Sequence, residues 1–373
     1  MPAVETQKIP TYGNWRRPDS GGIGNLSSLV TMMLVIMPIF AILIFIAFGW
    51  SPPLIGYVLI CAVTLVLFTI KDRHNRTIAH RIGARVGHTW ARVGGGTAYR
   101  SGPLSRIPWG QHQLPGLLAQ SRLSEATDSY GRPFALIYIP SSRHYTVVLA
   151  TDPDGMSLVD QSHIDNQVSY WGQWLANLAH EPGLAGASVT IETAPDSGTR
   201  LRREVASNIT EDAPELAKAM FAEVMDRYPS GSALTRAYIA LTYRADSKRR
   251  RNAEAMAHEL ASRLPALTAG LSEAGAGTAR PLPAQELCET IRMAYDPAST
   301  GLIEQARADS ETPDLEWSEV GPVAFQTGWD LYRHDSGVSR TWEMTLPPRG
   351  EVYSDVLQRL LAPVPSCDRK RVT

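Results

Sequence analysis

The strongest hydrophobic pattern in the chain lies between residues 20 and 70, where no Lys, Arg, Asp or Glu occurs. A bilayer-spanning helix needs roughly 20 apolar residues, so we expect two spans, at about 29–48 and 54–70. Prolines lack a backbone N–H and disfavour helix in the residue before them, and two adjacent prolines between the spans therefore predict a tight turn. That turn comprises Gly49, Trp50, Ser51, Pro52 and Pro53. A cleaved signal peptide is a poorer interpretation, because the apolar stretch is too long and a second span follows it.

Basic residues lie on both sides of this hairpin and not at its turn. Residues 71–100 hold seven Lys or Arg against Asp72 alone, and the N-terminal arm adds Lys8 and two arginines. Because positive charge is retained on the cytoplasmic side, we expect a multi-pass protein of the inner (cytoplasmic) membrane with both termini in the cytoplasm. The basic flank of the hairpin comprises Arg16, Arg17, Lys71, Arg73, Arg76, Arg81 and Arg85.

A second apolar periodicity follows the hairpin. One side of a helix with 3.6 residues per turn would carry Ile78, Ile82, Val86, Trp90 and Val93, and the adjoining side would carry Arg81, Arg85, His88 and Arg92. This pattern has two interpretations, which the sequence leaves open. In the first, the helix lies on an anionic leaflet, where each basic residue contributes about 1 kcal/mol to the free energy of binding. In the second, its apolar stripe packs on the soluble part of the chain.

Beyond residue 106 the pattern alternates between strands and helices. Two β-branched runs, 132–140 and 144–152, predict a hairpin, and a helix at 160–179 capped by Asp160 follows. Further strands are predicted at 187–195 and 235–243, as a pair around residues 335–337, and in an unfinished form at the last five residues. Further helices are predicted at 214–227, 253–273, 283–295 and 354–361. This order favours an α+β fold, an antiparallel sheet with helices packed on one face.

These patterns divide the chain into five segments. They are a cytoplasmic N-terminal arm (1–27), a transmembrane helical hairpin (28–71), a basic interfacial helix with a glycine-rich hinge (72–106), and two halves of an α+β domain (107–247 and 248–373). Whether the two halves share one core is open at this level.

Composition limits the possible functions. The formal net charge is −1, so nucleic-acid binding would have to rest on a local patch. Three cysteines are too few for a disulfide framework.

The search for catalytic motifs yields no catalytic, cofactor-binding or metal-binding residue. The chain has no GxxxxGK[ST], GxSxG, HExxH or CxxC pattern. The "HEPG" at His180 is better explained as a helix end, and the aspartates near Asp152 as a turn. Glu192 and Asp196 do not make a carboxylate pair, because Glu192 is expected on the exposed face of a strand. We therefore expect a protein without cofactor that is not an enzyme.

A run of four basic residues is the remaining candidate for contact with a partner or with lipid. It comprises Lys248, Arg249, Arg250 and Arg251. Such a run is most often a solvated loop; headgroup or nucleic-acid binding is the sharper alternative.

Four stretches carry a resemblance to a known family: TYGNWRRP, YRSGPLSRIPWGQHQLPGLLAQSRLSEATDSYGRPFALI, VTIETAPDSGTRLRREV and YRHDSGVSRTWEM. With the double span, they resemble an actinobacterial membrane-protein family encoded beside PrgI-like proteins and VirB4-like ATPases of conjugative, type IV secretion-like systems. The hairpin is similar to VirB3 or PrgI subunits, and the α+β region to the non-catalytic N-terminal part of VirB4-type ATPases. Members of the family extend beyond the last residue of this sequence.

The resemblance implies a non-catalytic scaffold subunit of a conjugation or type IV secretion-like apparatus. Such a subunit would anchor and dock an ATPase on the cytoplasmic face. The implied partners are other secretion-system membrane subunits, a VirB4-like ATPase and membrane lipids, in an oligomeric assembly. Two alternatives are a subunit similar to EccE of type VII secretion, which has a comparable layout, and a membrane-anchored enzyme of unknown substrate. A nucleic-acid-handling subunit would use the basic run together with Arg200, Arg202 and Arg203.

Overall fold

The computed structural model describes most of the chain in two compact units. The hairpin unit is Met1–Tyr99, Gln326–Tyr332 and Ser339–Leu357, and the α+β unit is Arg100–Phe325, Arg333–Val338 and Gln358–Thr373. The described residues are 11–12, 28–72, 76–105, 107, 110–153, 159–195, 204–205, 207–210, 212–227, 233–245, 252–309, 313–344, 352–353, 359–364, 367 and 369–373.

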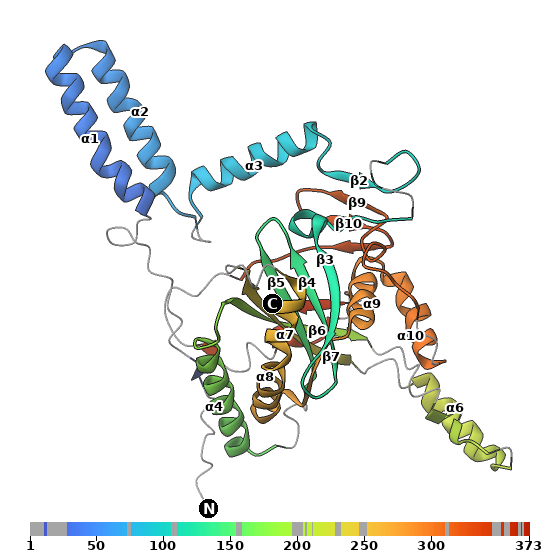
Figure 1. Cartoon of the computed structure of the whole chain (residues 1–373). Helices are drawn as coiled ribbons and strands as arrows, with labels where there is room; N and C mark the ends of the chain where they lie inside the picture. Colours follow the sequence, from blue (N-terminus) through green and yellow to red (C-terminus); the bar gives the residue numbers. More distant parts are fainter. Residues whose placement is uncertain are drawn as a thin grey trace, which may run out of the picture. The chain divides into compact units, whose positions relative to one another are not determined.

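Two apolar helices form the predicted hairpin. They are α1 (Ser28–Phe48) and α2 (Pro52–Thr69), and they run side by side (Figure 1). Both are long and apolar enough to cross a membrane, and only 6% of each span is buried in the structure. A helix with apolar residues on all sides needs an apolar environment on all sides. The positions agree with the predicted spans to within two residues.

The turn between these helices follows the predicted chemistry. Gly49 has φ 58°, a left-handed conformation that glycine adopts without steric cost. Its N–H donates to the Phe45 carbonyl at 2.8 Å, which ends α1. Ser51 is the N-cap of α2, and Pro52 and Pro53 occupy its first positions, where no backbone N–H is needed.

Helix α3 (Ile78–Val93) follows α2 and contains all the residues of the predicted apolar stripe. Thr77 caps its N-terminus by accepting from the His80 N–H at 3.3 Å. The glycine-rich segment ends it, since Gly94 donates to the Trp90 carbonyl at 2.9 Å and Gly96 to the Ala91 carbonyl at 2.8 Å. The hairpin unit also contains a short pair, β1 (Thr11–Tyr12) with β12 (Val352–Tyr353).

The α+β unit is built on a seven-stranded antiparallel sheet. Its order is β13-β6-β7-β5-β4-β3, and β8 pairs with the end of β5 that lies beyond β4. The strands are β3 (Arg122–Thr127), β4 (Pro133–Ile139), β5 (His144–Asp152), β6 (Leu184–Pro195), β7 (Ala233–Arg244), β8 (Thr278–Pro281) and β13 (Lys370–Val372). Four short strands form another sheet in the order β11-β10-β9-β2, namely β2 (Ala98–Arg100), β9 (Ala324–Thr327), β10 (Tyr332–His334) and β11 (Gly337–Ser339).

The main core lies on one face of the large sheet, under α4 (Gln161–Leu178), α7 (Ala253–Ala261) and α8 (Leu264–Leu271). Phe134, Val147 and Leu241 from the sheet are fully buried there against Met256 and Leu264. The core thus takes residues from both sides of position 248. Helices and strands from the two predicted halves therefore complete one another, because neither set alone covers this face of the sheet.

A smaller core covers the opposite face, where Ala135, Ile137 and Ala150 pack against Leu282 and Leu287. The last of these belongs to α9 (Ala284–Tyr295), which is followed by α10 (Thr300–Ala308). The α+β class is confirmed, but the expectation of helices on one face is wrong: helices cover both (Figure 1). The sequence of β4, PFALIYI, is apolar at successive positions, as in strands buried on both faces.

Several local predictions also needed correction. The helix expected at 253–273 is divided at residues 262–263, because Pro265 starts a new helix at a position that needs no N–H. Asp160 is the N-cap of α4, but its side chain makes no capping hydrogen bond. Strand β8 and helix α10 were not expected. Helix α6 (Glu215–Arg227) lies as expected, whereas residues 354–358 of the helix predicted at 354–361 lie outside the described residues.

Candidate functional site

Four of the residues predicted to flank the hairpin lie between the end of α2 and the second turn of α3, namely Lys71, Arg76, Arg81 and Arg85. Lys71 and Thr77 form a β-bridge, and the Asp72 N–H donates to the Arg76 carbonyl at 2.9 Å. Arg76 forms an ion pair with Glu343, which sequence reasoning missed because the two are far apart in the chain. Arg81 lies 3.4 Å from Asp72, and Arg85 follows one turn later on α3. The predicted residues Arg16, Arg17, Arg73 and Lys248–Arg251 lie outside the described residues.

The turn of the hairpin presents an aromatic side chain. Trp50 is 86% exposed and lies edge-on to Phe45, with ring centroids 5.8 Å apart. Tryptophan is enriched where a membrane meets water, because its ring is apolar and its N–H is polar. Its place at the end of α1 is therefore typical of an interfacial anchor.

The α+β unit holds a cavity of about 650 Å³ between β3, α9 and the segments around residues 113 and 317. Leu114 and Cys288 form part of its apolar wall. The Trp317 ring closes another side, held by hydrogen bonds from its Nε1 to the backbone carbonyl and hydroxyl of Ser121 at 3.2 and 3.1 Å. The size is that of a small-molecule or side-chain pocket.

Two polar side chains that line this cavity, Glu125 and Gln285, make internal hydrogen bonds. Glu125 accepts from the Ala284 N–H at 2.6 Å and so satisfies the start of α9. Gln285 donates to Glu289 at 3.2 Å. Burial, with a contribution from Glu289, raises the pKa of the Cys288 thiol to about 11. The thiol is therefore protonated near neutral pH, and a protonated thiol is a poor nucleophile.

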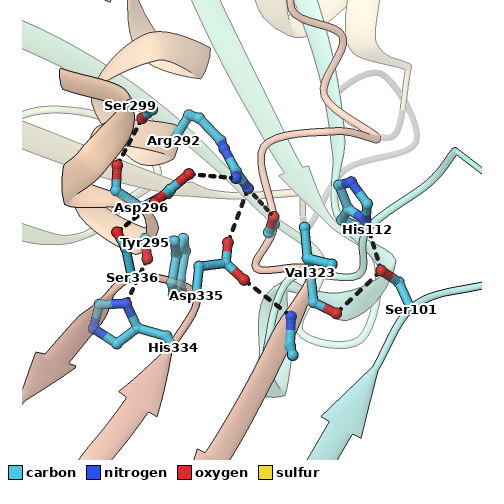
Figure 2. A network of polar contacts seen from close by, with 12 residues as sticks. Ser101, His112, Arg292, Tyr295, Asp296, Ser299, Val323, His334, Asp335 and Ser336 are labelled. Carbon is cyan, nitrogen blue, oxygen red and sulfur yellow. Dashed lines mark hydrogen bonds and ion pairs between the residues drawn. The ribbon is translucent and has the colours of Figure 1, made fainter. Parts of the chain in front are cut away.

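His112, which lines the cavity, contacts Ser101. Figure 2 shows this contact. The Ser101 hydroxyl oxygen is 2.9 Å from Nδ1 of His112 and 3.1 Å from the Val323 carbonyl oxygen. A hydroxyl has one proton and a carbonyl can only accept. Both contacts are satisfied when Ser101 donates to Val323 and His112 donates to Ser101. In that arrangement the histidine does not remove the serine proton, so the pair positions two segments rather than activating a nucleophile.

A second polar network joins the end of α9 to the turn between β10 and β11 (Figure 2). The Arg292 side chain is 15% exposed and contacts Asp296 at 2.9 Å and Asp335 at 3.1 Å. It also donates to the Gly321 carbonyl at 2.9 Å. Ser336 donates to Asp296 and accepts from the Ala298 N–H at 3.0 Å. The arginine is thus held by two carboxylates and a carbonyl, the arrangement of a structural clasp.

Buried His334, the last residue of β10, adds a further contact to this clasp. Its Nδ1 lies 2.5 Å from the Tyr295 carbonyl oxygen, and its side chain leaves no space beside Gly337 for a Cβ. The turn contains Asp335 at φ 35°, a conformation that Asp tolerates better than most residues. The strands around the DSG turn were expected, but the clasp was not.

The predicted exposure of Glu192 is wrong. It was expected on the exposed face of its strand, but the residue is 5% exposed. Arg371 donates to it at 2.5 Å, and Arg369 lies 3.6 Å from its other oxygen. The reason is that β13, from the far end of the sequence, pairs with β6 and places Arg371 opposite Glu192. Asp196 lies outside the described residues.

A comparison with protein-family models and with curated protein sequences finds no match to this chain. No catalytic, cofactor or metal residue was predicted. Among the described residues, no group of three or more His, Cys, Asp or Glu side chains could hold a metal ion. The features that sequence reasoning missed are the cavity and the Arg292 clasp, which join segments more than 20 residues apart.

Proposed function

We propose that this chain is a membrane-anchored, non-catalytic scaffold subunit of a conjugation or type IV secretion-like apparatus. The hairpin crosses the inner membrane twice, with both termini in the cytoplasm, and holds the α+β unit at the cytoplasmic face. There the unit docks a VirB4-like ATPase or other subunits of an oligomeric assembly. The observation that carries the membrane anchor in this proposal is the exposed apolar surface of α1 and α2, which lipid or other membrane helices would cover.

The chemistry of the α+β unit supports a structural role over an enzymatic one. Its buried charges are paired with one another, as Asp128 is with Arg132 and Arg292 is with Asp335. The Cys288 thiol is protonated near neutral pH, and Ser101 donates to a carbonyl. Buried charges that serve to fix structure are expected in a domain whose task is to present a defined surface.

The proposed topology predicts opposite results for two reporter fusions. A reporter that is active only outside the cytoplasm is expected to be active when fused after Ser51, in the turn, and inactive when fused after Gly94, beyond α3. A reporter active only in the cytoplasm should give the reverse pattern, which serves as the control for expression. Activity of the first reporter at Gly94 but not at Ser51 would contradict the topology.

The scaffold role predicts specific partners. Tagged protein purified in a mild detergent from its native membrane, and analysed by mass spectrometry, is expected to retain a VirB4-like ATPase. An unrelated two-span protein at the same level is the control. Recovery of an FtsK-like ATPase instead would favour the EccE-like alternative. A pure protein with no secretion-system component would contradict the scaffold role.

A further inference from the structure

Helix α3 has an apolar side that nothing in the described part of the hairpin unit covers. Ile82, Val86, Trp90 and Val93 are between 49% and 85% exposed. At 100° per residue these side chains lie on one side of the helix. Within the unit, the ring of His88 contacts that of Trp329, with centroids 5.5 Å apart. His88 does not lie on the apolar side of α3, so this contact does not cover the stripe. The apolar side is therefore available to another surface.

The charges of α3 are of one sign. The helix contains Arg81, Arg85 and Arg92 and no Asp or Glu. Arg81 faces the exposed Asp72; Arg85 and Arg92 have no carboxylate partner among the described residues. These three arginines lie beside the apolar stripe, so a single surface can contact the arginines and the stripe together. A surface complementary to this side of α3 is apolar where it meets the stripe and negatively charged where it meets the arginines.

The start of α3 is fixed to the end of α2. The Ile78 N–H donates to the Ile70 carbonyl at 3.3 Å, and the Lys71–Thr77 bridge closes the loop between the helices. When α2 spans a bilayer, the first turn of α3 is consequently at the boundary between hydrocarbon and headgroups. At that depth, the complementary surface is the bilayer itself.

We propose that α3 binds the surface of a bilayer that contains anionic lipids, with Val86 and Trp90 inserted among the acyl chains and the arginines at the phosphate groups. This inference rests on the proposed membrane anchor. It gives the scaffold a second membrane contact, which sets the orientation of α3 and depends on lipid charge. Arginine and lysine stems can reach past apolar surface to place their charge at the headgroups.

Site-directed labelling of the full-length protein in vesicles tests this. Polarity-sensitive probes are placed singly at Val86→Cys and at Ala84→Cys, which lies about 200° away around the helix and is the matched control. Cys61 and Cys367 are replaced by Ser, and buried Cys288 is retained. The vesicles contain phosphatidylcholine alone or mixed with phosphatidylglycerol, and iodide quenching is measured.

Iodide quenching at residue 86 is expected to fall severalfold in the anionic vesicles relative to residue 84, which corrects for the repulsion of iodide by the vesicles. Each arginine is expected to contribute about fivefold to the binding constant for anionic vesicles. Replacing Arg81, Arg85 and Arg92 with Gln should therefore remove the difference in quenching between the two residues. Equal quenching of residue 86 in both lipid mixtures would overturn the proposal. Protection of both residues in both mixtures would also overturn it, since protein would then cover α3.

A third probe separates this inference from the anchor on which it rests. Leu59→Cys, in α2, should be inaccessible to iodide in both lipid mixtures if the hairpin spans the bilayer. Accessibility at residue 59 would overturn the anchor and the inference together. Protection at residue 59 with full accessibility at residue 86 in anionic vesicles would overturn the inference alone.

Discussion

Replacing Asp128 with Ala is expected to destabilise the α+β unit by about 3 kcal/mol, because it removes the buried acceptor of three partly buried donors. The Asp128 side chain is fully buried. It accepts from the backbone N–H groups of Tyr130 and Arg132 at 2.9 Å each, and from Nε of Arg132 at 2.8 Å. Without the carboxylate, these N–H groups and the arginine charge are still shielded from water in the folded state, but they no longer have the acceptor that offsets this cost.

This network also positions the turn between β3 and β4 against the helices. Arg132 donates to Thr268 of α8 at 3.1 Å, and the Ser129 N–H donates to the Ala261 carbonyl at the end of α7 at 3.1 Å. Asp128→Asn should be milder than Asp128→Ala, because the amide oxygen can still accept from the backbone while its NH₂ cannot pair with the guanidinium. Glu215→Ala, at an exposed pair with Lys218, is the control and should change stability by less than about 0.5 kcal/mol.

The same carboxylate predicts a pH dependence. Burial acts to raise the pKa of Asp128, but hydrogen bonds from Arg132 and Tyr130 outweigh it and hold the pKa below its usual value. A lowered folded-state pKa contributes stability above the unfolded pKa, near 4, and that stability is lost as pH falls through the folded pKa. The wild-type advantage over Asp128→Asn should therefore shrink below about pH 4.

Cys288 provides the measurement for these variants. In a background where Cys61 and Cys367 are Ser, this buried thiol reacts with a thiol reagent only when the unit opens. The urea concentration at which Cys288 becomes reactive thus reports on the α+β unit in the full-length protein in detergent. A midpoint for Asp128→Ala equal to that of Glu215→Ala would show that the network is not needed for stability.

Replacing Arg292 with Met is expected to cost about 3 kcal/mol or more, because it leaves two carboxylates without their cation. The Asp335 side chain is only 8% exposed and that of Asp296 is 21% exposed. Arg292→Lys keeps the charge but has no planar fork to meet Asp296, Asp335 and the Gly321 carbonyl at once, so it should be intermediate. Arg227→Met, at an exposed ion pair with Glu223, is the matched control.

The Arg292 variants should loosen one region before the whole unit. The Ala324 N–H donates to Asp335 Oδ1 at 3.0 Å, and the Asp335 N–H donates to the Ala324 carbonyl at 3.1 Å. Hydrogen exchange at these two amides should accelerate in Arg292→Met while amides in β5 and β7 change little. Uniform acceleration across the large sheet, or none at all, would contradict a local clasp.

The sequence predicted elements best where one physical cause acts along the chain. Apolar length and adjacent prolines placed α1, α2 and the turn at Gly49–Pro53, and the 3.6-residue period placed α3 and α4. Helical period and strand alternation do not predict the burial of a residue that a distant segment of the chain covers. Glu192 has the position of an outward residue in its strand, yet Arg371 of β13 covers it.

The sequence by itself determined the two apolar helices, the basic flank and the alternating elements of an α+β domain, because hydrophobicity, proline geometry and helical period are local properties. Only the tertiary structure decided that helices cover both faces of the sheet, that Asp128 and Arg292 are buried clasps, and that a cavity forms beside Trp317. Each of these depends on which distant segments meet. Such meetings are fixed by packing over the whole core, and no short pattern along the chain encodes them.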